Sequence, residues 1–175
     1  MPTKDRDQVF LDSLMRTLSI EDKVGEMTQL TLGMLCDGSG PYTLDEPHTL
    51  NDEKLKKAIV DLKIGSILNS GGHAYSSSKW NALIQGIQDA ATKEKTSGIP
   101  VLYGIDAIHG ATYTSDADLS PQQIGLAATW NTELVRKIAE SSAKDVYESG
   151  IPWNFSPVLD LGIDPRWPRF WETFG

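Results

Sequence analysis

The alternation of strand-like and helix-like segments constrains the fold of this chain more than any other feature. Four apolar segments with the character of strands lie at 28–35, 64–68, 99–106 and 151–161, and segments with helical periodicity separate them. Strands that are joined through helices run parallel, so the alternation predicts an α/β fold with a parallel sheet. We expect residues 1–175 to form a single domain.

A repeated tetrapeptide supports this prediction. The tetrapeptide Ser-Gly-Ile-Pro occurs at 97–100 and again at 149–152. Each copy ends a helical segment and begins an apolar run that ends in an aspartate, Asp106 in the first case and Asp160 in the second. Glycine terminates helices, and proline suits the first residue of a strand, where no ladder donor is needed. The two copies therefore indicate a repeated helix-to-strand unit.

Helix ends and one loop can also be predicted. Ser19 and Asp22 have the spacing of a capping box before a short helix, and Asn51 and Asn131 are expected to begin two further helices. Residues 7–18 place Phe10, Leu11, Leu14 and Leu18 on one helical face. Residues 36–50 are rich in glycine, proline and aspartate and predict a loop.

Two architectures fit the pattern, an open doubly wound sheet of the flavodoxin type and part of a (β/α) barrel. In both, ligands bind at the carboxyl ends of the strands. Polar segments follow three of the predicted strands, at 69–73, 106–110 and 161–169. No glycine-rich phosphate-binding motif follows a strand, so a nucleotide cofactor is not indicated.

Composition excludes several other functions. The net charge of −8 and the absence of a basic cluster argue against a nucleic-acid partner. No apolar run approaches the ~20 residues of a membrane span, and the N-terminus lacks the apolar core of a signal peptide. Cys36, His48, His73 and His109 are not at ligand spacing, so we predict no metal site and no cofactor. The cellular location is not indicated.

Four of the five tryptophans fall in the last third of the chain. Large rings dominate protein cores, so core packing is the simpler interpretation, and a sugar-stacking pocket is the alternative.

The segments GIDAIHG, GLAATWN, SPVLDL and DPRWPRFWETFG resemble the family-three glycoside hydrolases, the β-glucosidase and exo-glucanase group. The resemblance extends from LSIEDKVGEMTQL to Gly175. It implies a (β/α)₈ barrel followed by a second α/β domain in the whole enzymes, and retaining hydrolysis of a terminal β-linked glucose. It also implies that this chain corresponds to the N-terminal half of the barrel, with four (β/α) units.

The resemblance implies sugar-binding residues. Asp106 and Arg169 would contact the terminal glucose, because a carboxylate accepts hydroxyl hydrogen bonds and a guanidinium donates a fork of them. The alternatives are a loop-forming role for Asp106 and an ion pair of Arg169 with Glu172 or Asp164. The residues expected to order the loop or to support the pocket are Glu172, Arg166, Trp167 and His109. For His109, a hydrogen-bonded core histidine is favoured over a catalytic role.

The resemblance implies no catalytic residue in this chain. Retaining glycosidases use two carboxylates about 5–5.5 Å apart. The resemblance places the nucleophilic aspartate in a later Ser-Asp-Trp-like motif, which does not occur in these 175 residues, and the acid/base glutamate later still. We therefore expect weak binding of glucose or β-glucosides and no turnover by the chain alone. The alternatives are an assembly module with no ligand and a segment that works with a complementary chain.

A half barrel would expose two sheet edges and its inner face, so we expect a homodimer in which two halves complete each other. Three polar residues, Asp116, Asp118 and Ser120, stand where the resemblance implies small or apolar ones, and Ile163 stands where it implies a basic one. Charges placed where apolar contacts would lie increase solubility. Engineering of a fragment and natural drift are both consistent with them.

Overall fold

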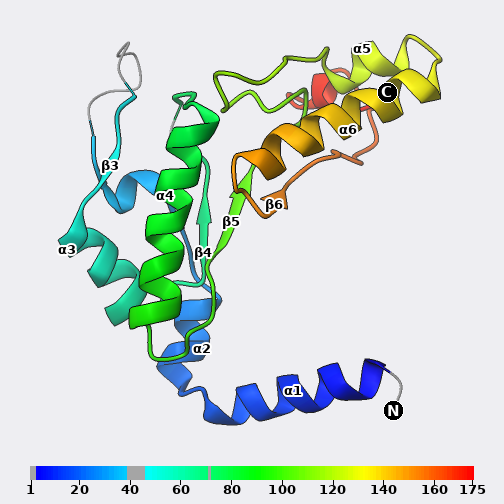
Figure 1. The fold of residues 1–175 in the computed structure, drawn as a ribbon. Helices are drawn as coiled ribbons and strands as arrows, with labels where there is room; N and C mark the ends of the chain where they lie inside the picture. Colours follow the sequence, from blue (N-terminus) through cyan, green and yellow to red (C-terminus); the bar gives the residue numbers. More distant parts are fainter. Residues whose placement is uncertain (1–2, 39–45, 71) are drawn as a thin grey trace.

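The computed structural model describes residues 3–38, 46–70 and 72–175. Its centre is a four-stranded parallel sheet with the order β1-β4-β5-β6, as Figure 1 shows. The strands are β1 (Gln29–Thr31), β4 (Ser66–Leu68), β5 (Leu102–Ile105) and β6 (Trp153–Asn154). The prediction of an α/β fold with a parallel sheet is confirmed.

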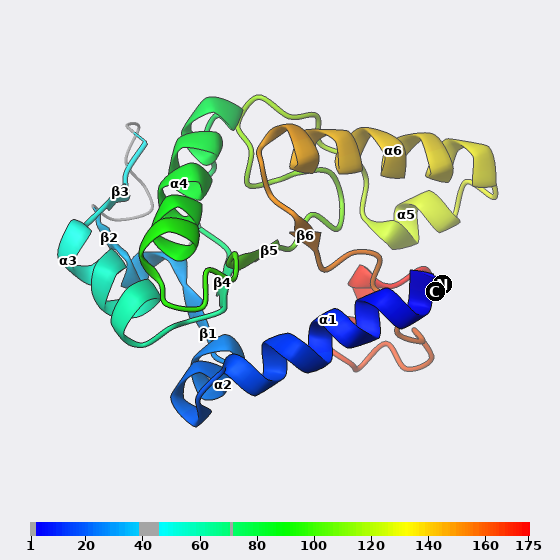
Figure 2. The ribbon, with the colours of Figure 1, turned by 60° about the horizontal axis from the view of Figure 1, so that its bottom comes forward.

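The strand order distinguishes between the two predicted architectures. Each successive parallel strand is added at the same edge of the sheet, whereas a flavodoxin-type sheet reverses direction after its first strands. When every crossover is right-handed and each new strand is added at the same edge, the connecting helices lie on one face of the sheet. Figure 2 shows α4 (Ser77–Asp89) and α6 (Thr132–Glu148) on the same side. The order is that of consecutive barrel units, and the sheet of the described residues does not close into a barrel.

The remaining elements precede, connect or follow these strands. They are α1 (Thr3–Thr17), α2 (Ile20–Glu26), η1 (Leu32–Met34), β2 (Cys36–Asp37), β3 (Thr49–Leu50), α3 (Asp52–Leu55), the π-helical turns η2 (Lys56–Asp61) and η3 (Ala90–Glu94), α5 (Gln123–Ala127) and η4 (Phe170–Glu172).

The predicted loop at 36–50 is wrong at its two ends. Strands β2 and β3 pair antiparallel there, with Cys36 opposite Leu50. Cys36 is buried in the core, and its burial raises the pKa of the thiol to about 11. The middle of the predicted loop, residues 39–45, lies outside the described residues.

The strands are shorter than predicted, for identifiable reasons. After β1 the chain enters a 3₁₀ turn, in which residues three apart face the same side, so that Leu32 and Leu35 are both fully buried. Strand β6 has a described neighbour on one side only, and Pro152 and Pro157 lack the donor that a longer ladder needs. The expected long run at 151–161 is therefore mostly irregular.

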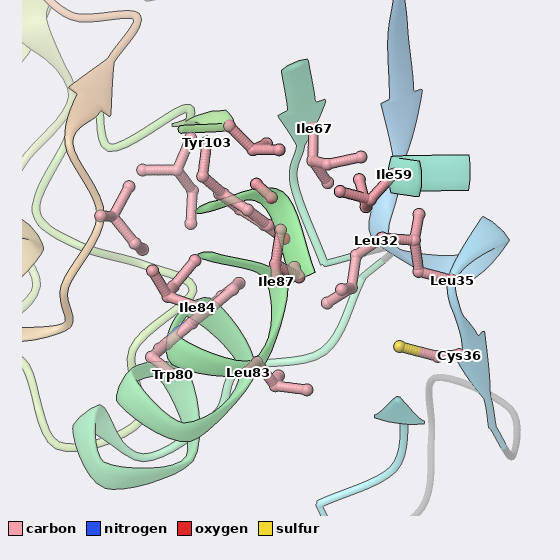
Figure 3. Close-up of a cluster of buried hydrophobic side chains, with 14 of the residues drawn as sticks. Leu32, Leu35, Cys36, Ile59, Ile67, Trp80, Leu83, Ile84, Ile87 and Tyr103 are labelled. Atoms are coloured by element: carbon pink, nitrogen blue, oxygen red, sulfur yellow. The ribbon is translucent and has the colours of Figure 1, made fainter. Parts of the chain in front are cut away.

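The core lies between the sheet and its covering helices, as Figure 3 shows. Trp80 of α4 packs edge-on against Tyr103 of β5, with ring centroids 5.7 Å apart. The indole nitrogen of Trp80 donates to the carbonyl of Tyr113 at 2.7 Å. These contacts fix α4 against the strand that leads into the loop at 106–110.

Helix α1 extends away from this core in Figure 1. Two residues of its predicted apolar face are exposed, Phe10 to 65% and Leu11 to 49%, whereas Leu14 is half-buried. Across the described parts of the chain, no helix combines the length and the apolar composition that crossing a bilayer requires.

Candidate functional site at the carboxyl edge of the sheet

Strands β4 and β5 carry two polar side chains at adjacent positions just beyond their carboxyl ends. Asn69 follows β4, Asp106 follows β5, and the Asn69 amide nitrogen Nδ2 donates to Oδ2 of Asp106 at 2.8 Å. The backbone amide of Asp106 donates in turn to Oδ1 of Asn69 at 3.3 Å. The two bonds use both ends of the Asn69 amide, which orients the half-buried Asp106 carboxylate.

The backbone of Asn69 is itself held in place. Its φ of 48° lies in the left-handed region, which asparagine tolerates better than most residues. The hydroxyl of Tyr103 donates to its carbonyl at 2.8 Å, and its own amide donates to the carbonyl of Gly104 at 3.0 Å. Asn69 is not among the site residues predicted from the sequence. Its position directly after a strand, at the start of a polar segment, is the feature that indicates a place in the site.

The end of β6 is hydrogen-bonded to the loop after β5 in a similar way. Oδ1 of Asn154, the last residue of β6, accepts from the backbone amide of Ala107 at 3.1 Å. The ends of β4 and β6 are therefore both joined by side-chain hydrogen bonds to residues 106–107, which follow β5, and these bonds order the polar groups at this edge of the sheet.

Arg169 and Glu172 lie in the segment that follows β6. Both Nε and Nη2 of Arg169 donate to Oε2 of Glu172, at 2.9 and 2.5 Å. The Arg169 side chain is 58% exposed, whereas the Glu172 side chain is 12% exposed. Glu172 raises the pKa of Arg169 further, and the more distant carboxylates of Asp160 and Asp106 act in the same direction. Glu172 therefore holds one side of the guanidinium, and the rest of the group is accessible.

Gln123 of α5 anchors this segment to the rest of the fold. Its side chain is buried and bonds to the backbone on both sides of the segment: Nε2 donates to the carbonyls of Val158 at 3.1 Å and Glu172 at 2.5 Å, and Oε1 accepts from the amide of Val158 at 3.2 Å. One glutamine thus positions the ion pair of Arg169 and Glu172 beneath α5.

Arg166 and Trp167 occupy the tip of the same segment. The Arg166 side chain is 89% exposed and forms a bidentate pair with Asp164, which lowers the pKa of that carboxyl. Trp167 is half-buried, and its amide donates to the carbonyl of Asp164 at 3.0 Å. Arg166 thus makes its contacts within the loop, and its part in ordering the loop stays a prediction.

His109 contributes to the loop after β5 through its backbone. Its carbonyl accepts from the amide of Ser120 at 3.0 Å, which ties the two ends of the segment 109–120 together. The side chain of His109 is half-buried. This geometry fits a supporting role, and contact of His109 with a sugar stays a prediction.

The tryptophans differ widely in exposure. Trp80 is fully buried, whereas Trp130 and Trp171 are exposed to 94% and 48%. The core-packing interpretation therefore does not account for the exposed indoles, of which Trp171 donates to the carbonyl of Pro168 at 2.9 Å beside the Arg169 ion pair.

Asp116, one of the unexpected polar residues, has a structural contact. Its two carboxylate oxygens accept from the amide and the hydroxyl of Ser77 at 2.9 and 2.7 Å, at the N-terminus of α4. These bonds lower the pKa of Asp116. Its charge therefore stabilises a helix end in addition to any effect on solubility.

The described residues contain no cluster of three or more histidine, cysteine, aspartate or glutamate side chains with the geometry of a metal site. The polar groups at the carboxyl edge are instead hydrogen-bond acceptors and donors of the kind that recognise hydroxyl groups.

The fold and this edge together define a portion of a (β/α)-repeat domain with a polar site at the carboxyl ends of its strands. Residues 19–175 match the model of the glycosyl hydrolase family 3 N terminal domain. The chain belongs to glycoside hydrolase family 3, which confirms the resemblance inferred from its motifs.

Similar proteins include β-glucosidases and an exo-glucanase. The lysosomal beta glucosidase of Dictyostelium discoideum is 41% identical over 174 residues, which cover 95% of this chain and 20% of that protein. The exo-1,3/1,4-beta-glucanase from a Pseudoalteromonas species superimposes with a TM-score of 0.73 at 29% identity, over 95% of this chain and 19% of that one. The beta-glucosidase from Listeria innocua in complex with glucose gives 0.70 at 29% identity, over 96% and 21%. The chain thus spans about a fifth of the length of these relatives.

Proposed function

We propose that this chain is the N-terminal half-barrel portion of a retaining β-glucosidase-type glycoside hydrolase and that it carries part of a glucose-binding subsite. In this proposal Asp106 accepts hydrogen bonds from two hydroxyls of a terminal glucose. Arg169 donates to the same ring from its accessible side. Glu172 holds the guanidinium, and Trp167, His109 and Arg166 shape or order the surrounding loops.

The observation that carries the proposal is the orientation of the Asp106 carboxylate by Asn69 at the carboxyl edge of the sheet, with Arg169 held by Glu172 in the segment that follows β6. An oriented carboxylate and a guanidinium with free donors form a complementary pair of acceptor and donor groups for vicinal hydroxyls. The membership of the family and the similarity to a beta-glucosidase in complex with glucose support the same ligand class.

Titration calorimetry of the full chain with glucose tests the subsite. We expect weak, saturable binding that Asp106→Asn and Arg169→Gln each reduce by about tenfold, because hydrogen bonds to charged groups are the stronger ones. Asp37→Asn is the matched control, since Asp37 lies on the separate β2–β3 hairpin. Equal heats from all three variants and the parent chain would contradict the proposal.

The chain alone is proposed to have no hydrolytic activity. The resemblance places the nucleophile and the acid/base in segments that are not part of this sequence, and loss of either carboxylate costs orders of magnitude in rate. Addition of a chain that supplies the remaining barrel units should restore release of nitrophenol from an aryl β-glucoside. Turnover by this chain alone would contradict the assignment of both carboxylates to other segments.

We further propose that the isolated chain associates with a second copy. Strands β1 and β6 are the two edges of the described sheet, and the segment after β6 exposes Leu159, Leu161 and Ile163. Unpaired edges and accessible apolar side chains favour association. The same observations favour the alternative function, a half-barrel assembly module of engineered or natural origin, which would dimerise without binding glucose.

A further inference from the structure

A row of aromatic side chains connects the β2–β3 hairpin with the carboxyl edge of the sheet. At the hairpin end, Nδ1 of His48, the residue before β3, lies 2.6 Å from the hydroxyl of Tyr75. Tyr75 packs edge-on against Trp80 with ring centroids 5.0 Å apart, and Trp80 packs in the same way against Tyr103 at 5.7 Å. The rings of Tyr75, Trp80 and Tyr103 are fully buried, so a displacement of one ring must be accommodated by the next.

The other end of this row reaches the carboxylate that we propose binds glucose. The hydroxyl of Tyr103 donates to the carbonyl of Asn69 at 2.8 Å, and the side-chain amide of Asn69 donates to Asp106 at 2.8 Å. Each step from His48 to Asp106 is therefore a hydrogen bond or a ring contact between neighbouring residues. Such a contiguous network couples two positions when one of its members has two discrete states.

The bond between His48 and Tyr75 requires a neutral imidazole. Burial raises the pKa of Tyr75, and Cys36 and Glu46 add to this effect, so the hydroxyl keeps its proton. That hydroxyl donates, and Nδ1 of His48 accepts while the ring proton lies on Nε2. Protonation at Nδ1 removes this acceptor. The described part of the chain offers the buried hydroxyl of Tyr75 no second one.

The surroundings of the half-buried His48 oppose its protonation. Burial has the largest effect in lowering the pKa of His48, and the charges of His73 and Lys79 act in the same direction. His73 lies in the segment after β4 with its ring centroid 5.1 Å from that of Tyr75, and Lys79 lies in α4. A Cβ atom at Gly38 would approach Cδ2 of His48 to 2.7 Å, so the imidazole is packed against this backbone.

The acidic groups of the hairpin have other partners. Glu46 accepts from the backbone amide of Ser76, the N-cap of α4, at 2.5 Å. Asp37 of β2 accepts from Nδ2 of Asn51 at 2.9 Å and pairs with Lys54 of α3 at 3.6 Å. Within the described residues, neither carboxylate is hydrogen-bonded to the imidazole, so neither compensates a charge on it directly.

We propose that the bond between His48 and Tyr75 is a pH-sensitive latch for the carboxyl edge of the sheet. With His48 neutral the latch is closed, and the row of rings holds Asn69 against Asp106. Protonation of His48 opens the latch, the row relaxes, and the Asp106 carboxylate loses its fixed orientation. The functional consequence rests on the proposed glucose subsite and is weaker glucose binding in mild acid.

The direction of the pH response follows from proton linkage. The pKa of His48 is lowered in the closed state, and an open state returns it toward its ordinary value of 6.5. The open state therefore binds the proton more tightly, and the closed fraction falls as the pH drops below that value.

The side-chain amide of Asn69 provides a readout that needs no sugar. Its NMR signals and those of the His48 ring are followed in the full chain from pH 8 to pH 5. We expect both to shift with one common midpoint below 6.5. In His48→Asn the Asn69 signals should stay constant. Asparagine tolerates the φ of 64° at this position, and its Oδ1 can accept from Tyr75 without titrating.

His73→Asn separates the two histidines. The substitution removes one of the charges that oppose protonation of His48, so the midpoint of the Asn69 signals should move to higher pH. Three results would overturn the latch: constant Asn69 signals in the parent chain, an unchanged titration of these signals in His48→Asn, or a pH response that His73→Asn abolishes.

Glucose titrations at pH 7.5 and pH 5.5 test the consequence. We expect the affinity of the parent chain to fall by up to about fivefold at pH 5.5, the loss of one neutral hydrogen bond, and the affinity of His48→Asn to stay the same. An equal fall in both proteins would show that the latch does not reach Asp106. Absence of glucose binding at both pH values would contradict the proposed subsite, and the Asn69 signals would still decide whether the latch exists.

Discussion

The amide of Asn69 and the carboxylate of Asp106 are joined by a 2.8 Å hydrogen bond across the ends of two parallel strands, 37 positions apart in the sequence. The bond exists because β4 and β5 pair in a register that sets Leu68 opposite Gly104. The residues just beyond that pair then lie within reach of each other. The sheet register thus determines the orientation of the carboxylate that we propose binds glucose.

Asn69→Gly should reduce glucose affinity about fivefold, because Asp106 loses the donor that fixes its side chain. Glycine accepts the positive φ at this position, so the backbone should be retained. Calorimetric titration with glucose measures the effect. Asn51→Gly removes a comparable pair of side-chain bonds at the start of α3 and should leave the affinity unchanged. An unchanged affinity in Asn69→Gly would show that Asp106 does not depend on Asn69 for its orientation.

Gln123→Ala should lower the free energy of unfolding by about 2–4 kcal/mol, because it leaves buried backbone groups of Val158 and Glu172 without partners. Urea denaturation followed by tryptophan fluorescence measures this loss. The adjacent Gln122→Ala is a matched control, because Oε1 of Gln122 is buried without a partner among the described residues. We expect that substitution to be near neutral, and a loss as large as that of Gln123→Ala would argue against the anchoring role.

Local signals in the sequence predicted the elements whose stability is local. The capping box of Ser19 and Asp22 is present, and Asn131 begins α6 with its side chain accepting from Leu134 at 3.0 Å. Both glycines of the repeated tetrapeptide, Gly98 and Gly150, adopt positive φ after their helices. The apolar periods of strands and helices and the hydrogen bonds of helix caps involve residues only a few positions apart, so the sequence predicts them directly.

Features that depend on distant partners could not be predicted in this way. The apolar face of α1 indicated burial, but Phe10 is exposed because no described segment covers it. The contribution of Gln123 depends on backbone groups 35 and 49 positions away, and no periodic pattern signals such a contact. For the site, the motif resemblance supplied Asp106 and Arg169, while Asn69 emerged only from the pairing of β4 with β5.

The acid dependence of stability should depend on Asp22. Lys63 Nζ lies 2.5 Å from its Oδ1, and the Ser19 amide donates to its Oδ2 at 2.8 Å. These contacts lower the pKa of Asp22 from 3.8 to about 2, and the contact with Lys63 has the largest effect. A carboxyl whose pKa is lower in the folded state stabilises the fold above its unfolded pKa and loses this contribution as the pH falls toward the folded value.

Asp22→Asn should therefore be less stable than the parent chain at pH 6, and the difference should shrink between pH 4 and pH 2. Urea midpoints across this range provide the measurement. Asp7→Asn on the exposed helix α1 is the control and should follow the parent at every pH. A constant gap between Asp22→Asn and the parent down to pH 2 would rule out the ionic contribution.

Self-association through the open sheet should be visible in solution mass. By light scattering, the mass of the parent chain should rise with concentration, from the monomer value of 19.2 kDa to about twice that value. The double substitution Leu161→Lys and Ile163→Lys should return the mass to that of a monomer, because charges on exposed apolar positions of the segment after β6 oppose association. Phe10→Lys on α1 discriminates between surfaces. If Phe10→Lys alone produces the monomer while the double variant stays dimeric, contact occurs through α1 and the two half barrels do not complete each other at β1 and β6.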